Sequence, residues 1–170
     1  MTKTEKMAKL SVFTALSLVL SFVETLIPAP MPLPGLKIGL SNAGILVSMS
    51  VFGFKEGLIV GVIKSLMSGL FFGRVSAILY SLPATIASAL VMGVGIFVVN
   101  GKKRLLSEVG VSVMGSCAFN AVQLKIASVL VSDESIFSIL PYFQLLSVFT
   151  GVFIGAASSF LINRVKKEEL

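Results

Sequence analysis

The chain has 170 residues, of which 55% are hydrophobic and only 13% charged, and its mean hydropathy is +0.99. A soluble domain usually carries about 25% charged residues, so this composition excludes an ordinary water-soluble globule. One cysteine and no histidine exclude an intrachain disulfide and remove the commonest metal ligand. The length predicts a single integral membrane domain over residues 1–170, with no room for a separate catalytic domain.

Six apolar segments reach or approach the roughly 20 residues that a helix needs to cross a hydrocarbon core. The first ends in prolines and lacks a small-residue cleavage site, so we expect a span and not a cleaved signal peptide. The sequence therefore predicts an all-α, polytopic membrane protein built as a six-helix bundle. The predicted spans are 8–27, 38–54, 56–73, 75–99, 109–131 and 139–163.

The lysines and arginines predict the orientation of this bundle. Ten of the 14 fall on the side that holds both termini, whereas Lys37 and Arg74 lie on the other side and Lys64 and Lys125 lie within spans. Because positively charged loops stay on the inner side, both termini are predicted to be cytoplasmic, in a bacterial plasma membrane. The same bias explains most of the net charge of +6 without nucleic acid as a partner.

The segment between the first two predicted spans is rich in proline. It reads Pro28-Ala-Pro-Met-Pro-Leu-Pro-Gly-Leu-Lys37. Proline lacks a backbone N–H and restrains the residue before it, so the segment is predicted to be stiff and extended. It could close over the outer mouth of the bundle, or it could serve only as a rigid connector.

Ionisable residues inside the apolar segments are the strongest functional indication. Glu24, Lys64 and Lys125 occupy positions where a charge is costly unless it faces a bundle interior or a wet cavity. Apart from Lys64, nearly all strongly polar residues within the spans fall in the outer half of the membrane. This bias predicts a binding cavity that opens to the outside. A structural Glu24–Lys64 ion pair is the alternative, and Lys125 could instead reach the outer interface.

Asn120 and Gln123 are three residues apart and so share one helix face. Their amides both donate and accept hydrogen bonds, which suits a small anionic or amide-rich solute, although an interhelical amide clasp remains the alternative. For Lys37 and Arg74, solvated loop charges are the alternative. The predicted substrate-binding residues are Glu24, Lys37, Asn42, Lys64, Arg74, Tyr80, Asn120 and Gln123.

Catalytic signatures are missing from the sequence. There is no phosphate-binding loop of the ATPase type, and no Cys/His set for zinc. Asp133 is the single aspartate, so no aspartate cluster can hold magnesium on a diphosphate. We therefore expect a protein that is not an enzyme and that binds no metal or cofactor.

Three stretches carry a resemblance to a known family. Residues Glu24 to Asn42, Gly69-Leu-Phe-Phe-Gly73 and Gly115 to Gln123 resemble the Gx transporter family, most specifically in the pattern PG-x-K-x-G-x-x-N. The similarity covers essentially the whole chain. This family is grouped with the substrate-binding S components of energy-coupling factor (ECF) transporters, and it is also labelled heptaprenyl diphosphate synthase component I.

The resemblance implies a six-helix S component that captures a vitamin-like micronutrient from outside. Such components work with a transmembrane coupling protein and two ATPase subunits, and they dock through small residues spaced AxxxA in the first helix. The nearest match here is Ser11-xxx-Ala15 with Ala8 beside it, so these three residues are the expected docking positions. Two other functions stay open: a membrane subunit linked to prenyl diphosphate or quinone synthesis, with Lys37, Lys64 and Arg74 on the diphosphate, and a structural subunit without a ligand.

Overall fold

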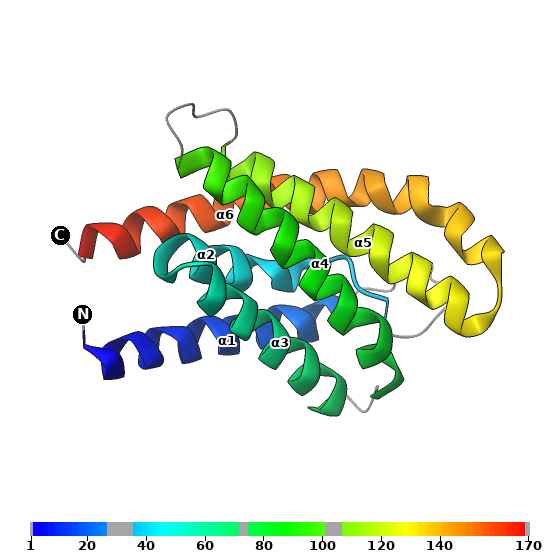
Figure 1. Ribbon diagram of the computed structural model, residues 1–170, viewed down its shortest axis with the longest axis horizontal. Coiled ribbons are helices and arrows are strands. Elements are labelled where there is room, and N and C mark those ends of the chain that lie inside the picture. The colour runs from blue at the N-terminus through cyan, green and yellow to red at the C-terminus, as the bar shows by residue number, and fades with distance from the viewer. Residues whose placement is uncertain (1, 27–35, 72–74, 101–106, 169–170) are drawn as a thin grey trace.

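The computed structural model describes residues 2–26, 36–71, 75–100 and 107–168, and every regular element within these ranges is helical (Figure 1). The all-α prediction is therefore confirmed for the described chain. The elements are α1 (Lys3–Leu26), the 3-10 turn η1 (Leu40–Asn42), α2 (Ala43–Phe52), α3 (Phe54–Phe71), α4 (Val75–Asn100), α5 (Glu108–Val131), the 3-10 segment η2 (Glu134–Ile139) and α6 (Leu140–Glu168).

Four of the described helical stretches are long and apolar enough to cross a membrane: Lys3–Leu26, Val75–Phe97, Glu108–Val131 and Glu134–Val165. Large apolar side chains, Phe97, Phe149 and Phe153 among them, are exposed on their outer surfaces. Water would make such surfaces costly, whereas lipid chains cover them without penalty. These features are those of a membrane protein.

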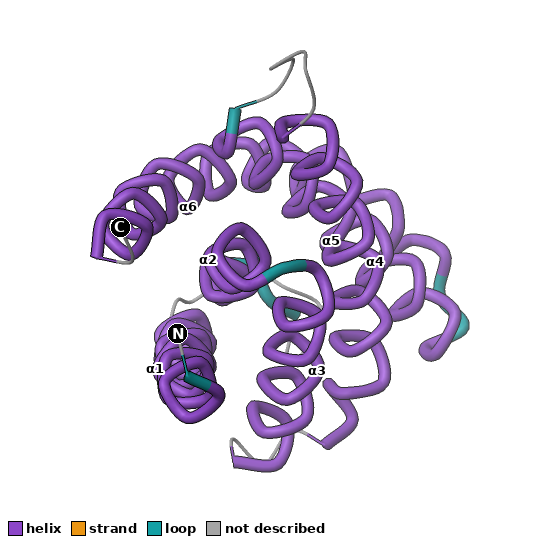
Figure 2. Tube along the Cα trace, turned by 60° about the vertical axis from the view of Figure 1, so that its left-hand side comes forward, coloured by secondary structure: helices purple, strands orange, loops and turns teal. Residues whose placement is uncertain are grey.

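The predicted second span, 38–54, does not form a membrane-length helix. Gly39 adopts a left-handed conformation with φ 100°, and α2 that follows η1 has ten residues. Ten residues rise only about 15 Å, half of a hydrocarbon core of about 30 Å. Residues 41–49 are all buried, and Figure 2 shows α2 inside the arc that α3, α4, α5 and α6 make, next to α1. Its high hydropathy thus reflects a core helix, which apolar content alone does not distinguish from a span.

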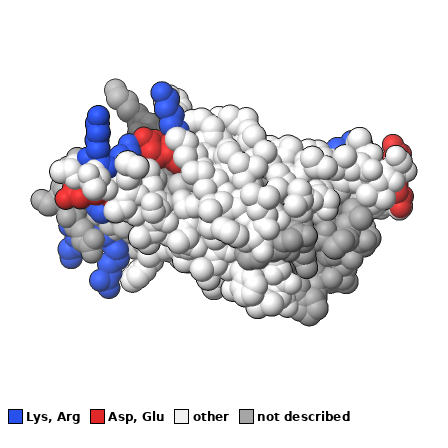
Figure 3. Space-filling view, turned by 90° about the horizontal axis from the view of Figure 1, so that it is seen from below, with Lys and Arg blue, Asp and Glu red and all other residues white. Residues whose placement is uncertain are grey.

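Successive helices run in alternating directions, so both termini lie at one end of the bundle (Figure 1). We call this the terminal end and the opposite one the distal end. Lysine and arginine side chains gather at the terminal end in Figure 3. There Lys6 of α1 forms an ion pair with Glu56 of α3, with 2.5 Å between Nζ and Oε1. The side of a membrane that this end faces stays a prediction from the sequence.

Small residues let α5 and α6 pack closely. A Cβ atom at Gly151 would lie 2.6 Å from the Cα of Val113, and one at Gly155 would lie 2.5 Å from the Cα of Val109. Backbones at this separation leave no space for a side chain, as is common where membrane helices meet. In contrast, α1 contacts α2, α3 and η1 and is the least buried of the four membrane-length helices.

Candidate functional site

Glu24 lies near the distal end of α1 and is 6% exposed. Its Oε1 accepts a hydrogen bond from the backbone N–H of Leu40, and its Oε2 accepts one from Ser41 Oγ at 3.1 Å. Both donors belong to η1, which leads directly into α2. The carboxylate therefore sits at the start of a short helix, where unpaired N–H groups and the helix dipole favour negative charge.

Lys64 of α3 is completely buried. Its Nζ donates to Ser41 Oγ at 2.9 Å and to Asn42 Oδ1 at 3.2 Å, and it lies 5.7 Å from the ring centroid of Phe119. Lys64 forms no direct ion pair within the described residues. The Glu24–Lys64 ion pair considered from the sequence is thus replaced by an indirect link, because the hydroxyl of Ser41 stands between the two charges.

Lys37 turns into the bundle instead of lying at its mouth. Although it follows the proline-rich segment, it is only 5% exposed. Its Nζ donates to Ser21 Oγ of α1 at 2.5 Å and to Ser68 Oγ of α3 at 2.8 Å. Its backbone N–H donates to Gln123 Oε1 of α5 at 3.2 Å. The alternative of a solvated loop charge is therefore wrong for Lys37, which ties three helices together.

Three amide side chains, Asn42, Asn120 and Gln123, are completely buried around these charges. Each of them forms hydrogen bonds through only one of its two polar atoms. Asn42 Oδ1 accepts from Lys64, Gln123 Oε1 accepts from the backbone of Lys37, and Asn120 Nδ2 donates to Ser147 Oγ at 2.6 Å and to the carbonyl of Ile38 at 3.4 Å. The structure therefore bonds Asn42 to Lys64 and Gln123 to Lys37, whereas Asn120 bonds to the backbone carbonyl of the residue next to Lys37.

The other end of each amide has no hydrogen-bond partner among the described residues. These atoms are Asn42 Nδ2, Asn120 Oδ1 and Gln123 Nε2. Roughly 90% or more of buried polar groups in native proteins are paired, because an unpaired one carries its full desolvation cost. Two donors and one acceptor near the buried lysines are therefore available for hydrogen bonds to a bound group.

Lys64 has no carboxylate in direct contact among the described residues. We call Glu24, Lys37 and Lys64 the ionic cluster, which brings two basic side chains and one acidic side chain together. Lys64 is completely buried, and the hydroxyl of Ser41 separates its ammonium from the carboxylate of Glu24. A buried charge is costly unless an opposite charge compensates it. An anion in direct contact with Lys64 would therefore be favourable.

The remaining predicted residues lie in different places. Tyr80 is buried in an apolar cluster that includes Leu36. Arg74 and residues 28–35 of the proline-rich segment lie outside the described residues. Lys125 is exposed with its Nζ 5.2 Å from the Phe137 ring centroid, apart from the ionic cluster. Its position fits a side chain that reaches the interface.

The sequence reading missed the serines that hold the cluster. Ser21 and Ser41 contact the charges directly, as does Ser68. The spacing of two of these serines could have indicated their role. Ser21 precedes Glu24 by three residues and Ser68 follows Lys64 by four, so each serine shares a helix face with a charged residue.

In the described chain, helices of membrane length enclose buried charged and amide side chains. The chain is thus a helical membrane protein with a polar site inside its bundle. The family model described as heptaprenyl diphosphate synthase component I matches residues 13–161, and the chain belongs to this family. The resemblance seen in the sequence is confirmed, because this is the Gx transporter family under its other label. No curated protein and no solved structure matches the chain.

Proposed function

We propose that the protein is a substrate-binding membrane subunit of the ECF type, which captures a small anionic solute from outside at the ionic cluster. The observation that carries this proposal is Lys64, which is completely buried without a direct ion pair among the described residues and lies near three amides that each have one unpaired end. A carboxylate or phosphate group of the solute would pair with the ammonium of Lys64. Asn42 Nδ2 and Gln123 Nε2 would donate to the solute, and Asn120 Oδ1 would accept from it.

The short helix α2 supports an anionic solute. With its preceding turn it runs from Leu40 to Phe52, and its N-terminus is buried inside the bundle. Half-helices of this kind direct their N–H groups at anionic substrates in several transporter folds. In this protein Glu24 already occupies the N-terminus, so an incoming anion would share or replace the contacts of that carboxylate.

Energy for transport would come from partner proteins, since the sequence carries no nucleotide-binding motif. The docking surface would be the exposed face of α1 with Ala8, Ser11 and Ala15. Small side chains four apart allow a second helix to approach closely. The proposed partners are a transmembrane coupling protein and two ATPase subunits, with both termini in the cytoplasm of a bacterial cell.

The family description favours a second candidate, a membrane subunit that holds a prenyl diphosphate. The same two buried lysines would then bind the diphosphate, and the chain would support a separate synthase. Both candidates use the ionic cluster, but they differ in whether the ligand carries a long hydrocarbon chain and in whether it is transported.

Ligand binding to the purified protein tests the proposal. A thermal-shift screen should include anionic vitamins, flavins and prenyl diphosphates, followed by calorimetry of any hit. Lys64→Met should lower the affinity for a true ligand by at least about tenfold, or about 1.4 kcal/mol. Lys125→Met, at an exposed lysine, is the matched control and should leave the affinity unchanged. Equal affinities in Lys64→Met and the wild type would contradict the proposal. Binding restricted to prenyl diphosphates would favour the second candidate.

A further inference from the structure

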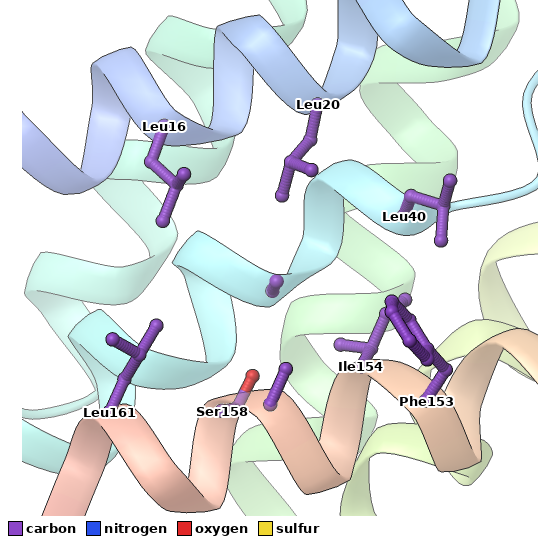
Figure 4. Close-up of a pocket in the computed structure, with 9 residues that line it drawn as sticks. Leu16, Leu20, Leu40, Phe153, Ile154, Ser158 and Leu161 are labelled. Carbon is purple, nitrogen blue, oxygen red and sulfur yellow. The ribbon is translucent and has the colours of Figure 1, made fainter.

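A cavity of about 190 Å³ lies between α1 and α6, next to the start of α2 (Figure 4). None of the predicted solute-binding residues lines it. Its walls and floor are apolar except for one serine. The lining residues are Leu16 and Leu20 of α1, Leu40 and Ala43 at the start of α2, and Phe153, Ile154, Ala157, Ser158 and Leu161 of α6.

Differences in side-chain size explain why a cavity forms here. Ala43 and Ala157 are small, whereas larger side chains line the rest of the cavity, namely the leucines of α1 and Phe153 of α6. Phe153 and Ala157 are exposed, so the cavity opens sideways at the surface between α1 and α6. Leu16 lies near the middle of a helix of membrane length. An occupant would therefore enter laterally from the hydrocarbon core.

The buried hydroxyl of Ser158 distinguishes this cavity from an ordinary apolar groove that faces lipid. It is completely buried, and its Oγ has no partner among the described residues. Two other hydroxyls of α6 donate to the carbonyl four residues earlier: Ser147 to Phe143 at 2.7 Å and Thr150 to Leu146 at 2.9 Å. Ser158 makes no such bond and lines the cavity, with its oxygen on the cavity side of α6 in Figure 4.

The polarity of the lining narrows the choice of occupant. A buried water usually makes about three hydrogen bonds, and this lining offers one polar side chain. A plain acyl chain would fill the space but leave the hydroxyl of Ser158 unpaired, which is unfavourable in an apolar medium. An apolar molecule with one oxygen atom would pack against the apolar lining and form a hydrogen bond with the hydroxyl of Ser158.

We propose that this cavity binds a lipid-soluble hydrocarbon ligand that carries one hydroxyl or carbonyl oxygen, with that oxygen hydrogen-bonded to Ser158. The site is separate from the ionic cluster, yet Leu40 forms part of its lining and donates its N–H to Glu24. An occupant would bridge α1, α2 and α6, because each of them contributes lining residues.

The test compares two saturated probes that differ only in one hydroxyl group, hexahydrofarnesol and its parent hydrocarbon farnesane. Both are titrated into the purified full chain in detergent micelles, and binding is followed by thermal unfolding and calorimetry. The wild type should bind hexahydrofarnesol at least about tenfold more tightly than farnesane. Ser158→Ala, which hardly changes the volume, should reduce this preference to less than about twofold.

Filling the cavity provides the second arm. Ala157→Phe should abolish binding of both probes, while Ala156→Phe, on the exposed neighbouring position outside the lining, should leave it unchanged. Equal binding of hexahydrofarnesol and farnesane by the wild type would assign the cavity to a plain acyl chain and overturn the proposal. An undiminished preference for hexahydrofarnesol in Ser158→Ala, or absence of binding, would also overturn it. A dimer that Ala157→Phe dissociates would do the same, since the groove would then belong to a second copy.

Discussion

The hydroxyl of Ser41 lies between Glu24 and Lys64, 3.1 Å from the carboxylate Oε2 and 2.9 Å from the ammonium Nζ. It donates to the carboxylate and accepts from the ammonium, and it thereby links α1, η1 and α3. Because the two charges do not touch, each keeps part of its capacity to interact with a third group. This arrangement explains how a charged cluster can be held inside the bundle and still accept an anion.

Removing this hydroxyl should destabilise the bundle. In Ser41→Ala the ammonium keeps Asn42 and the carboxylate keeps the N–H of Leu40, but each loses one hydrogen bond to a charged group. We expect a loss of about 1–3 kcal/mol in the free energy of unfolding, measured by denaturant titration in detergent. Ser138→Ala, at an exposed serine of η2, is the control. Coincident unfolding transitions of Ser41→Ala and Ser138→Ala would argue against a stabilising role of the Ser41 hydroxyl between Glu24 and Lys64.

Glu24 should be replaceable by a free carboxylate. Glu24→Ala leaves the N-terminus of α2 and the two lysines without their anion, so the free energy of unfolding should fall by about 3–5 kcal/mol. Added acetate should restore part of the lost stability, whereas chloride at equal ionic strength should not. The measurement is the unfolding midpoint as a function of acetate concentration.

Glu134→Ala, at an exposed acidic position of η2, serves as the control and should show no specific response to acetate. If acetate and chloride act alike on Glu24→Ala, the cluster does not present an anion site.

The close approach of α5 and α6 should not tolerate a side chain. Gly155→Leu would place a bulky group against the Cα of Val109, where even a Cβ would lie only 2.5 Å away. Overpacking of this kind costs typically about 1–3 kcal/mol, so the unfolding midpoint should fall. Ala156→Leu, on the exposed side of the same turn, should have little effect. A midpoint for Gly155→Leu equal to that of the wild type would mean that the helices do not pack this closely.

A bulky residue on the exposed face of α1 should block assembly without affecting the solute site. In Ala15→Phe the cluster is untouched because Ala15 is exposed, whereas a partner helix could no longer approach closely. Co-purification with the ECF coupling protein should fall strongly, and solute affinity should stay unchanged. Leu90→Phe, on the exposed face of α4, is the control. Unimpaired co-purification of Ala15→Phe would remove this face as the docking surface.

Hydropathy predicted most helices because membrane helices must be apolar over a fixed length. The predicted span 75–99 corresponds to α4 at Val75–Asn100, and 109–131 corresponds to α5 at Glu108–Val131. The exception is α2, whose apolar residues are buried against neighbouring helices and not against lipid. A sequence pattern counts apolar residues but does not report what covers them.

Part of the ionic cluster was predictable because charges inside apolar segments require partners. Glu24 and Lys64 stood out on this ground, and so did Lys125, which lies apart from the cluster at the ring of Phe137. Lys37 was also predicted to bind the solute, but a solvated loop charge stayed equally open because it follows a proline-rich segment, and only the fold shows it turned inward. The serines were missed because serine is common in membrane helices and only three-dimensional contacts distinguish those that hold a charge.

The most direct measurement is an experimental structure of the protein purified from its native membrane without added ligand. A captured anionic solute should give density within hydrogen-bonding distance of Lys64 Nζ and Asn42 Nδ2. A cluster in which protein groups satisfy all three amides and a protein carboxylate contacts each lysine would contradict the proposed capture of an anion.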